Sequence, residues 1–360
     1  MTQRSQALRR TWQLVAQLPS PAEGLTAVLL PGGSVVALGG DAALRTGARM
    51  AAELAPDATA WTKLPGAPVE LATPAALALN QSAVLVVAPA YANGNLAQPS
   101  KALLLDTVRR HWTVLPAVPL PLLAPHLLQI DKTHVLAAGA VGGPLGAIFD
   151  LQTYKWTVIK APVKDLASYS TTFLPGRGVL LMASVAITAN GQPYAVRRAW
   201  LLDERIAWHQ VARPPVPGDG AQAVVVDADK VLFAGARPTG DNPGAAAPPP
   251  LLYDAAGNNW VIAGDTGQVH RGGLVVALGY GHALLIGGHD AQGAPTTECL
   301  LFDGSRWHSA ESLPSPWAGY AVVGLPDSRV LLIGGDRRKA SVIQPVADTI
   351  EWSLDPGFPS

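Results

Sequence analysis

The segments LLIGG at 284–288 and LLFDGSRW at 300–307 decide the fold of this chain of 360 residues. The first is a short apolar run that ends in two glycines, and the second is an apolar run that ends in Asp303, a short turn and Trp307. Short aliphatic runs that end in turn residues are typical of β-strands joined by hairpins. The same order of elements recurs along the chain, so the sequence predicts a repeat protein.

Tryptophan marks the length of the repeat. Intervals of 49, 51, 44, 52, 52, 47 and 45 residues separate eight of the tryptophans, which are Trp12, Trp61, Trp112, Trp156, Trp208, Trp260, Trp307 and Trp352. The glycine-ended run recurs as VVALGG at 35–40 and LLIGG at 331–335, with weaker copies between them. Four short strands in each interval predict blades that stack around an axis, because one blade cannot bury both of its faces alone.

These elements resemble the Kelch family. The resemblance is carried by the periodic tryptophans, by diglycines (Gly39–Gly40, Gly287–Gly288, Gly334–Gly335) and by aromatic–Asp pairs on the third strand (Phe149–Asp150, Tyr253–Asp254, Phe302–Asp303). It covers nearly the whole chain and implies an all-β, seven-bladed Kelch-type β-propeller with four antiparallel strands per blade, like that of galactose oxidase. Four of the seven repeats lack the second glycine, and the first repeat lacks the third-strand Asp.

We expect residues 1–360 to form a single β-propeller domain. Its blades are expected at about 21–65, 72–116, 124–160, 168–212, 219–263, 271–311 and 318–354. The segments around Trp12 and Trp352 compete for the outer strand of the last blade. An N-terminal strand within residues 1–20 would close the ring there and hide its edges, and the alternative places Trp12 across the rim. Two unrelated β-sandwiches and a six-bladed ring are the other arrangements left open.

The composition excludes several classes of protein. Lys and Arg number 26 and so do Asp and Glu, so the chain has no excess positive charge to attract nucleic acid or an anionic membrane. Apolar residues make up 49% and charged residues 14%, which predicts a large core. No apolar run is long enough to span a bilayer, and no secretory signal is seen, so we expect a cytoplasmic protein without membrane insertion.

The sequence offers little catalytic or metal-binding chemistry. The eight histidines lack ligand spacing, although His270 and His289 could meet near Asp290. No phosphate-binding glycine loop, nucleophile elbow or catalytic triad is present, so no catalytic constellation, metal or cofactor is predicted. The single cysteine, Cys299, excludes an intrachain disulfide and is expected to be a packed core thiol, which excludes the copper-radical chemistry of some Kelch propellers.

Strand order divides the propeller into two faces. One carries the short turns between first and second strands and before each Trp. The other carries the longer connections after each diglycine and between blades, which include the proline-rich stretch 237–250. This stretch is expected to be either a lid or docking arm, or a stiff spacer. Binding groups concentrate on variable loops held by a rigid scaffold. We therefore expect ligand or partner contacts at His126, Tyr169, Arg237, Asp241, His270, Arg271, His289, Asp290, Trp317, Tyr320, Asp336 and Arg337.

The sequence favours a non-catalytic role. We expect an interaction scaffold that binds a protein or peptide partner across this second face, and a small polar or sugar ligand is the other ligand considered. The alternative is a sugar-acid epimerase or mutarotase-like enzyme with a pocket at the channel mouth. By resemblance to such Kelch enzymes, Arg271, Arg237 or Arg337 would hold an anionic group, and Glu23, Asp219 or His270 would move a proton. The sequence identifies neither the partner, nor any catalysis, nor the oligomeric state.

Overall fold

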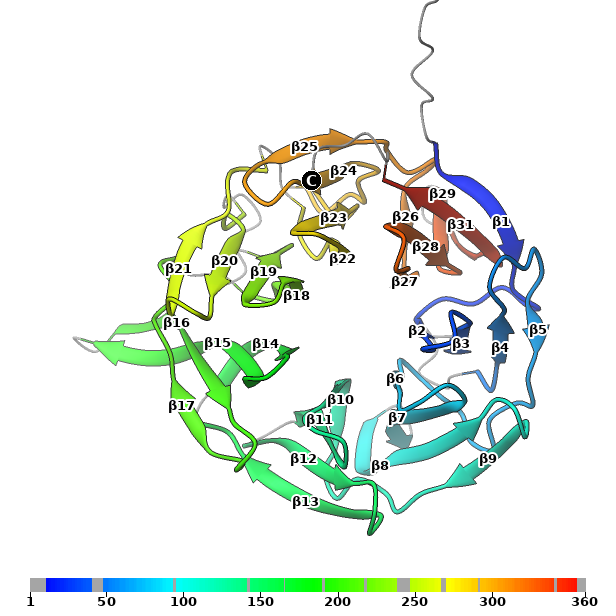
Figure 1. The fold of residues 1–360 in the computed structure, drawn as a ribbon, viewed down its shortest axis with the longest axis horizontal. Coiled ribbons are helices and arrows are strands. Elements are labelled where there is room, and N and C mark those ends of the chain that lie inside the picture. The colour runs from blue at the N-terminus through cyan, green and yellow to red at the C-terminus, as the bar shows by residue number, and fades with distance from the viewer. Residues whose placement is uncertain are drawn as a thin grey trace, which may run out of the picture.

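The computed structural model describes residues 11–40, 48–92, 95–140, 143–164, 166–189, 192–216, 219–237, 247–266, 270–290, 292–339 and 342–354. Its regular structure is all-β, and its antiparallel sheets are arranged around a common centre, as in a β-propeller (Figure 1). Within these ranges no helix has the length and apolar character that a membrane crossing requires.

The first four sheets each contain four antiparallel strands that follow one another along the chain. The first and second sheets consist of β2 (Leu25–Leu29), β3 (Val35–Gly39), β4 (Ala51–Leu54) and β5 (Thr62–Lys63), and of β6 (Ala75–Ala78), β7 (Ala83–Ala92), β8 (Asn95–Asp106) and β9 (His111–Val114). The third and fourth consist of β10 (Leu122–Gln129), β11 (His134–Ala140), β12 (Pro144–Asp150) and β13 (Lys155–Lys160), and of β14 (Leu166–Leu174), β15 (Gly178–Ala189), β16 (Gln192–Leu202) and β17 (Trp208–Gln210).

The remaining sheets end with a departure from this order. The fifth and sixth sheets consist of β18 (Gln222–Asp227), β19 (Lys230–Ala234), β20 (Leu251–Asp254) and β21 (Asn259–Ile262), and of β22 (Leu274–Gly279), β23 (His282–Ile286), β24 (Cys299–Phe302) and β25 (Trp307–Ala310). The seventh has the order β27 (Ala321–Gly324), β28 (Arg329–Ile333), β31 (Asp348–Ser353) and β1 (Gln13–Gln17). A small sheet of β26 (Trp317–Ala318), β29 (Asp336–Lys339) and β30 (Val342–Pro345) flanks it.

The two chain ends share the seventh sheet. Strand β31, which carries Trp352, pairs with β28 on one side and with β1 on the other. The segments around Trp12 and Trp352 were expected to compete for the outer position of the last sheet. The N-terminal strand β1 takes that position, which is one of the two arrangements left open, and Trp352 does not compete for it. Trp352 lies on the third strand, since β29 and β30 form a separate hairpin, and this leaves the outer position to β1.

The inner strands form a continuous cycle of contacts. Each of β2, β6, β10, β14, β18 and β22 contacts the inner strand of the next sheet, and β27 of the seventh sheet contacts β2 of the first. Seven clusters of buried apolar side chains in the described residues each join two neighbouring sheets. The core is therefore divided among the junctions between sheets, as expected where one sheet cannot bury both faces alone.

The periodic tryptophans lie in closely similar surroundings. At six junctions the indole Nε1 donates a hydrogen bond of 2.7–3.1 Å to a backbone carbonyl of the preceding sheet's exit, from Trp112 to Pro65, Trp156 to Pro116, Trp208 to Lys160, Trp260 to Ala212, Trp307 to Ala263 and Trp12 to Glu311. Trp61 differs, because its Nε1 donates to the Thr349 hydroxyl at 2.8 Å, within the seventh sheet. The junction of the first and seventh sheets is thus built differently from the others.

The recurrent Asp at the end of the third strand stabilises the turn to the fourth strand, where the periodic Trp lies. We call it the tying Asp. In the third sheet, Asp150 Oδ1 accepts the backbone N–H groups of Gln152 and Thr153 at 2.7 and 3.1 Å. Aspartate stabilises turns in this way because its short side chain reaches backbone donors two or three residues on. The same bonding to following backbone N–H groups occurs at Asp106, Asp203, Asp254 and Asp303.

The glycine that ends the second strand permits close packing against the next sheet. Gly39 has φ +78°, in the left-handed region that glycine adopts without a steric penalty. A Cβ at this position would lie 2.7 Å from the Leu71 carbonyl oxygen, in the entry to the second sheet. The close backbone approach that the diglycine motif predicts is present there.

Candidate functional site

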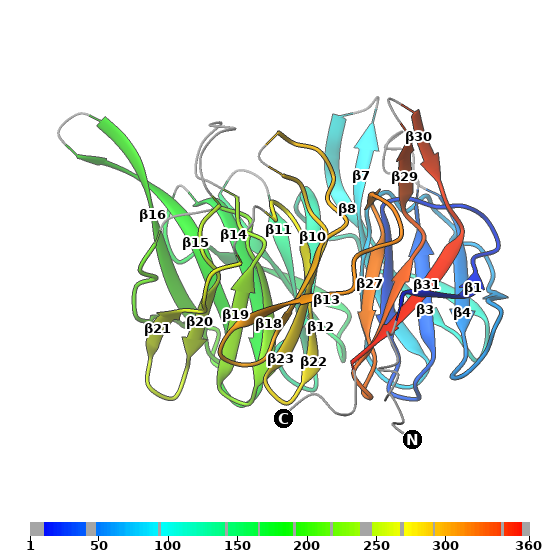
Figure 2. The same cartoon turned by 90° about the horizontal axis from the view of Figure 1, so that it is seen from above.

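Three long hairpins mark one face of the ring. The tips of β7–β8, β15–β16 and β29–β30 extend beyond the other strands on the same side (Figure 2). We call this side, which also carries the connections between sheets, the loop-rich face, and the opposite side the turn face. Longer connections were expected after the second strand of each repeat, but in the second and fourth sheets the described residues there are largely extended into paired strands.

A groove of about 840 Å³ opens on the loop-rich face between the third and fourth sheets. Its walls come from the β11–β12 connection and from the segment that leads from β13 to β14. They are formed by Ala140, Gly143, Pro144, Leu145, Lys160, Ala161, Pro162, Val163, Lys164, Leu166 and Tyr169. We call this the loop-face groove. Its volume is within the range of about 300–1,000 Å³ that ligand pockets occupy.

The chemistry of the loop-face groove is apolar with a basic rim. Leu145 is buried in the floor, whereas Lys160 and Lys164 are exposed. Burial raises the pKa of the Tyr169 phenol to about 12, although a backbone hydrogen bond with Gly139 acts in the opposite direction. The phenol is therefore neutral at physiological pH. Among its described residues, the groove combines aliphatic surface, a neutral hydroxyl and two ammonium groups.

Three residues nominated from the sequence occupy equivalent places at the entries to their sheets. Glu23, Asp219 and Arg271 each precede a glycine in the left-handed region, with φ of +63°, +63° and +66°. Two of these entries pair through the backbone with the segment that follows the second strand of their own sheet. Asp219 pairs with Arg237 in this way, and Arg271 pairs with His289. The repeat therefore sets these three residues around the same rim.

Arg237 extends from the fifth sheet to the entry of the sixth. A Cβ at Gly272 would lie 2.8 Å from Arg237 Nη2, so the absence of a side chain at Gly272 leaves room for the guanidinium. The Arg237 side chain is exposed at this point. Of the arginines that the sequence suggested as anion-binding residues, Arg237 is the most exposed to solvent on the loop-rich face.

Asp219 is engaged in a polar cluster at the junction of the fourth and fifth sheets. Its carboxylate accepts hydrogen bonds from the Ser168 hydroxyl, at 2.9 Å, and from the Ser184 hydroxyl. Arg197, which is only 3% exposed, lies near it: burial lowers the pKa of Arg197 to about 10, and the charge of Asp219 acts to raise it. Asp219 is thus held by hydrogen bonds at this junction, and its catalytic role stays a prediction.

Sequence reasoning missed Arg197 altogether. It lies in the pair Arg197–Arg198 within the apolar third strand of the fourth sheet, opposite Ser184. A charged pair between the apolar residues Val196 and Ala199 is the signal that could have indicated it, because a buried cation requires a partner.

The nominated histidines do not come together as a metal site. His270 is 3% exposed, with Nδ1 2.9 Å from the Gly287 carbonyl oxygen and Nε2 4.0 Å from a Glu298 carboxylate oxygen. His289 Nδ1 is 3.3 Å from the Arg271 carbonyl oxygen, and Asp290 Oδ1 accepts two backbone N–H groups of its own turn. No group of three or more metal-binding side chains occurs in the described ranges.

His126 lies apart from the other histidines, on the inner strand β10. Its Nδ1 is 3.4 Å from the Thr171 hydroxyl of the neighbouring inner strand. Although the side chain is exposed on the inside of the ring, the surrounding protein desolvates the imidazole and lowers its pKa.

The remaining nominated residues contribute mainly to packing. Trp317 is 2% exposed, and the Arg337 guanidinium lies 4.9 Å from its ring centroid while donating to Asp348 at 2.6 Å. Tyr320 is buried and donates to the Ile286 carbonyl at 3.3 Å, and Asp336 is buried as well. Burial of Trp317, Tyr320 and Asp336 limits their direct contact with a partner, whereas the Arg337 side chain is partly exposed.

Two further sequence predictions concern single residues. Cys299 is buried, as predicted, and burial raises the pKa of its thiol to about 12. Asp241 and most of the stretch 237–250 lie outside the described residues.

A comparison with protein-family models gives no match, and a comparison with curated proteins gives no significant match. The chemistry of the groove must therefore carry any functional conclusion.

Proposed function

We propose that this protein is a seven-bladed Kelch-type β-propeller that acts as an interaction scaffold, binding a protein or peptide partner through its loop-rich face. The seven four-stranded sheets are the blades, and β1 closes the ring by completing the last one. The cycle of inner-strand contacts and the repeated indole-to-carbonyl hydrogen bonds support this reading.

The loop-face groove is the observation that carries the proposal. Its apolar walls provide area for aliphatic side chains, and exposed Lys160 and Lys164 attract negative charge. A partner segment with Asp or Glu beside aliphatic residues fits this combination. Exposed ion pairs contribute little affinity each, about 0.2–1 kcal/mol, so apolar contact supplies most of the binding and the lysines set the preference.

Peptide selection tests the proposal. A random peptide library is selected against the full chain, and enriched peptides are titrated by fluorescence polarisation. We expect acidic–aliphatic sequences that bind about three- to tenfold more weakly to the double variant Lys160→Ala, Lys164→Ala, because two favourable charges are lost. Lys132→Ala removes an exposed lysine from a turn on the other face and serves as the matched control.

The outcome also separates the scaffold from the enzyme. Peptides that bind the double variant as tightly as the parent would place the contact elsewhere and contradict the proposed site. A thermal-shift screen of sugar acids gives the second arm. Stabilisation by a sugar acid that is lost in Arg271→Ala would contradict the scaffold and favour the epimerase-like alternative.

A further inference from the structure

A second groove, of about 650 Å³, opens on the turn face where the first and seventh sheets meet. Val35, Leu54 and Leu331 form a buried aliphatic floor, and Leu14 of β1 stands 59% exposed at the rim. This turn-face groove lies on the opposite face from the loop-face groove and shares no residue with it.

The turn-face groove forms where the repeat departs from its pattern. Its wall at 55–59 is the turn between β4 and β5, the one that lacks the tying Asp. The left-handed residue there is Asp57, two positions after residue 55, whereas in the third sheet Tyr154 follows Asp150 by four.

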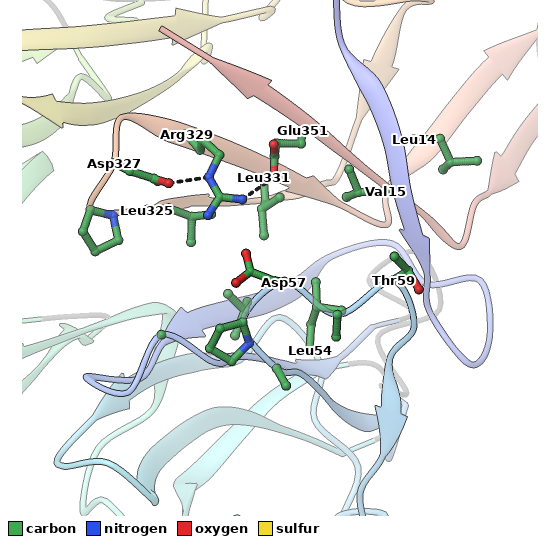
Figure 3. A pocket seen from close by; sticks show the side chains of 16 residues that line it. Leu14, Val15, Leu54, Asp57, Thr59, Leu325, Asp327, Arg329, Leu331 and Glu351 are labelled. Atoms are coloured by element: carbon green, nitrogen blue, oxygen red, sulfur yellow. Dashed lines mark hydrogen bonds and ion pairs between the residues drawn. The ribbon is translucent and has the colours of Figure 1, made fainter. Parts of the chain in front are cut away.

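Acidic side chains surround the aliphatic floor. On one wall, Arg329 Nε donates to Asp327 at 2.6 Å and Nη1 donates to Glu351 at 3.0 Å. Asp57 lies across the groove from this pair of contacts (Figure 3). The lining residues that the structure describes include three carboxylates and one guanidinium, which together carry two net negative charges.

Arg329, the one cation among the described lining residues, is held in its charged state. Burial acts to lower the pKa of Arg329, but the hydrogen bonds and charges of Asp327 and Glu351 outweigh it and raise the pKa. The guanidinium therefore neutralises one of its two partners at every physiological pH, and the groove stays acidic.

We propose that the turn-face groove binds an arginine or lysine side chain of a peptide, with a neighbouring aliphatic residue on the apolar floor. Charge complementarity selects this occupant, since a cation meets the excess carboxylate charge while Leu14, Val35 and Leu54 accept the aliphatic part. Because Arg329 already pairs with Asp327 and Glu351, Asp57 is the carboxylate that faces the incoming cation. This site is independent of the function proposed for the loop-rich face.

Two labelled peptides test the site on the full chain. Gly-Leu-Arg-Leu-Gly and Gly-Leu-Glu-Leu-Gly amides, each carrying fluorescein, are titrated at low salt by fluorescence polarisation. We expect the arginine peptide to bind at least about tenfold more tightly, because attraction replaces repulsion, and to weaken as salt rises. Equal binding of both peptides would overturn the proposal.

Two variants with opposite expected effects locate the contact. Asp57→Asn removes a charge at an exposed turn where asparagine tolerates the left-handed backbone, and we expect it to weaken the arginine peptide about two- to fivefold. Arg329→Gln removes the competing cation and strengthens binding by a similar factor. Asp227→Asn, on an exposed turn of the fifth sheet outside the groove, is the matched control.

The same titrations define the contrary result. Unchanged affinity in Asp57→Asn, or a loss of binding in the Lys160→Ala, Lys164→Ala variant, would put the peptide outside the turn-face groove. Thermal melting of each variant confirms that folding is retained, and the exposed position of Asp57 makes it the substitution that least disturbs the fold.

Discussion

The loop-face groove lies between two sheets that follow the repeat, whereas the turn-face groove lies at the one junction that does not. At the first, Trp208 donates to the Lys160 backbone carbonyl, as the tryptophans do at five other junctions. At the second, Trp61 donates to a side chain, Thr349, and the adjacent turn has no tying Asp. One groove is made by connections laid over a regular scaffold, and the other by a change in the scaffold itself.

The two grooves also differ in charge. Lys160 and Lys164 make the loop-face groove basic, and Asp57, Asp327 and Glu351 make the turn-face groove acidic. A chain with equal numbers of acidic and basic residues can therefore present opposite local fields on its two faces. Net charge alone conceals this difference.

The largest effect is expected from Trp61→Ala. The indole is 8% exposed and fills the junction of the first and seventh sheets, so its loss leaves a cavity that costs about 3–5 kcal/mol of unfolding free energy. Chemical denaturation measures this, with Trp112→Ala as the equivalent change at a regular junction. A loss below about 1 kcal/mol for Trp61 alone would mean that the two sheets are not packed against each other.

A smaller effect is expected from Thr349→Val. Thr349 is fully buried, and valine keeps its shape while leaving the Trp61 indole N–H without its acceptor, which costs about 1–3 kcal/mol. Thr62→Val, at an exposed position of β5, is the control. An equal response to the two substitutions in urea unfolding would show that the irregular hydrogen bond contributes nothing.

Asp254→Ala tests the aspartate hydrogen bonds that the corresponding turn of the first sheet lacks. Asp254 Oδ1 accepts the backbone N–H groups of Ala256 and Gly257, so we expect a loss of about 0.5–1.5 kcal/mol. Ala55 holds the corresponding place in the first sheet, and Ala55→Gly should cost less, since no side-chain bond is lost there. A reversed order in thermal unfolding would contradict this account of the turns.

The smallest effect concerns the pH dependence of stability and His126, which lies on β10 of the third sheet. Its pKa in the folded state is below the ordinary 6.5, so the unfolded chain takes up the proton first as pH falls. The free energy of unfolding therefore keeps its full value above pH 6.5 and decreases as the pH falls below 6.5. His126→Gln should flatten the dependence of unfolding midpoint on pH between 7 and 5, and a dependence as steep as that of the parent would refute the assignment.

The sequence predicts the scaffold better than the site. The even spacing of Trp156, Trp208 and Trp260 arises because each tryptophan packs at an equivalent junction between sheets, and Asp150 stabilises a local turn. The repeated junctions and the turns can therefore both be predicted from the sequence. The order of the last sheet cannot, because β1 and β31 pair across the whole chain length. That pairing joins residues 13–17 to residues 348–351, and no local sequence pattern reports it.

The grooves escape sequence reasoning for a related reason. Pro144, Ala161 and Val163 have no chemistry that singles them out, and they become a wall only through the path of the chain between sheets. Tyr169 was found because an aromatic residue at a sheet entry is conspicuous. Asp57 lies in the repeat that lacks the tying Asp. The absence of that aspartate is the sequence feature that could have indicated Asp57.

Hydrogen–deuterium exchange of the full chain with each of two peptides tests the central claim, that the faces bind opposite charges. The account predicts that an acidic–aliphatic peptide slows exchange in the connection at 160–166, and that the arginine peptide slows it in the turn at 54–60. Protection of the same segment by both peptides, or of neither segment by either, would contradict it.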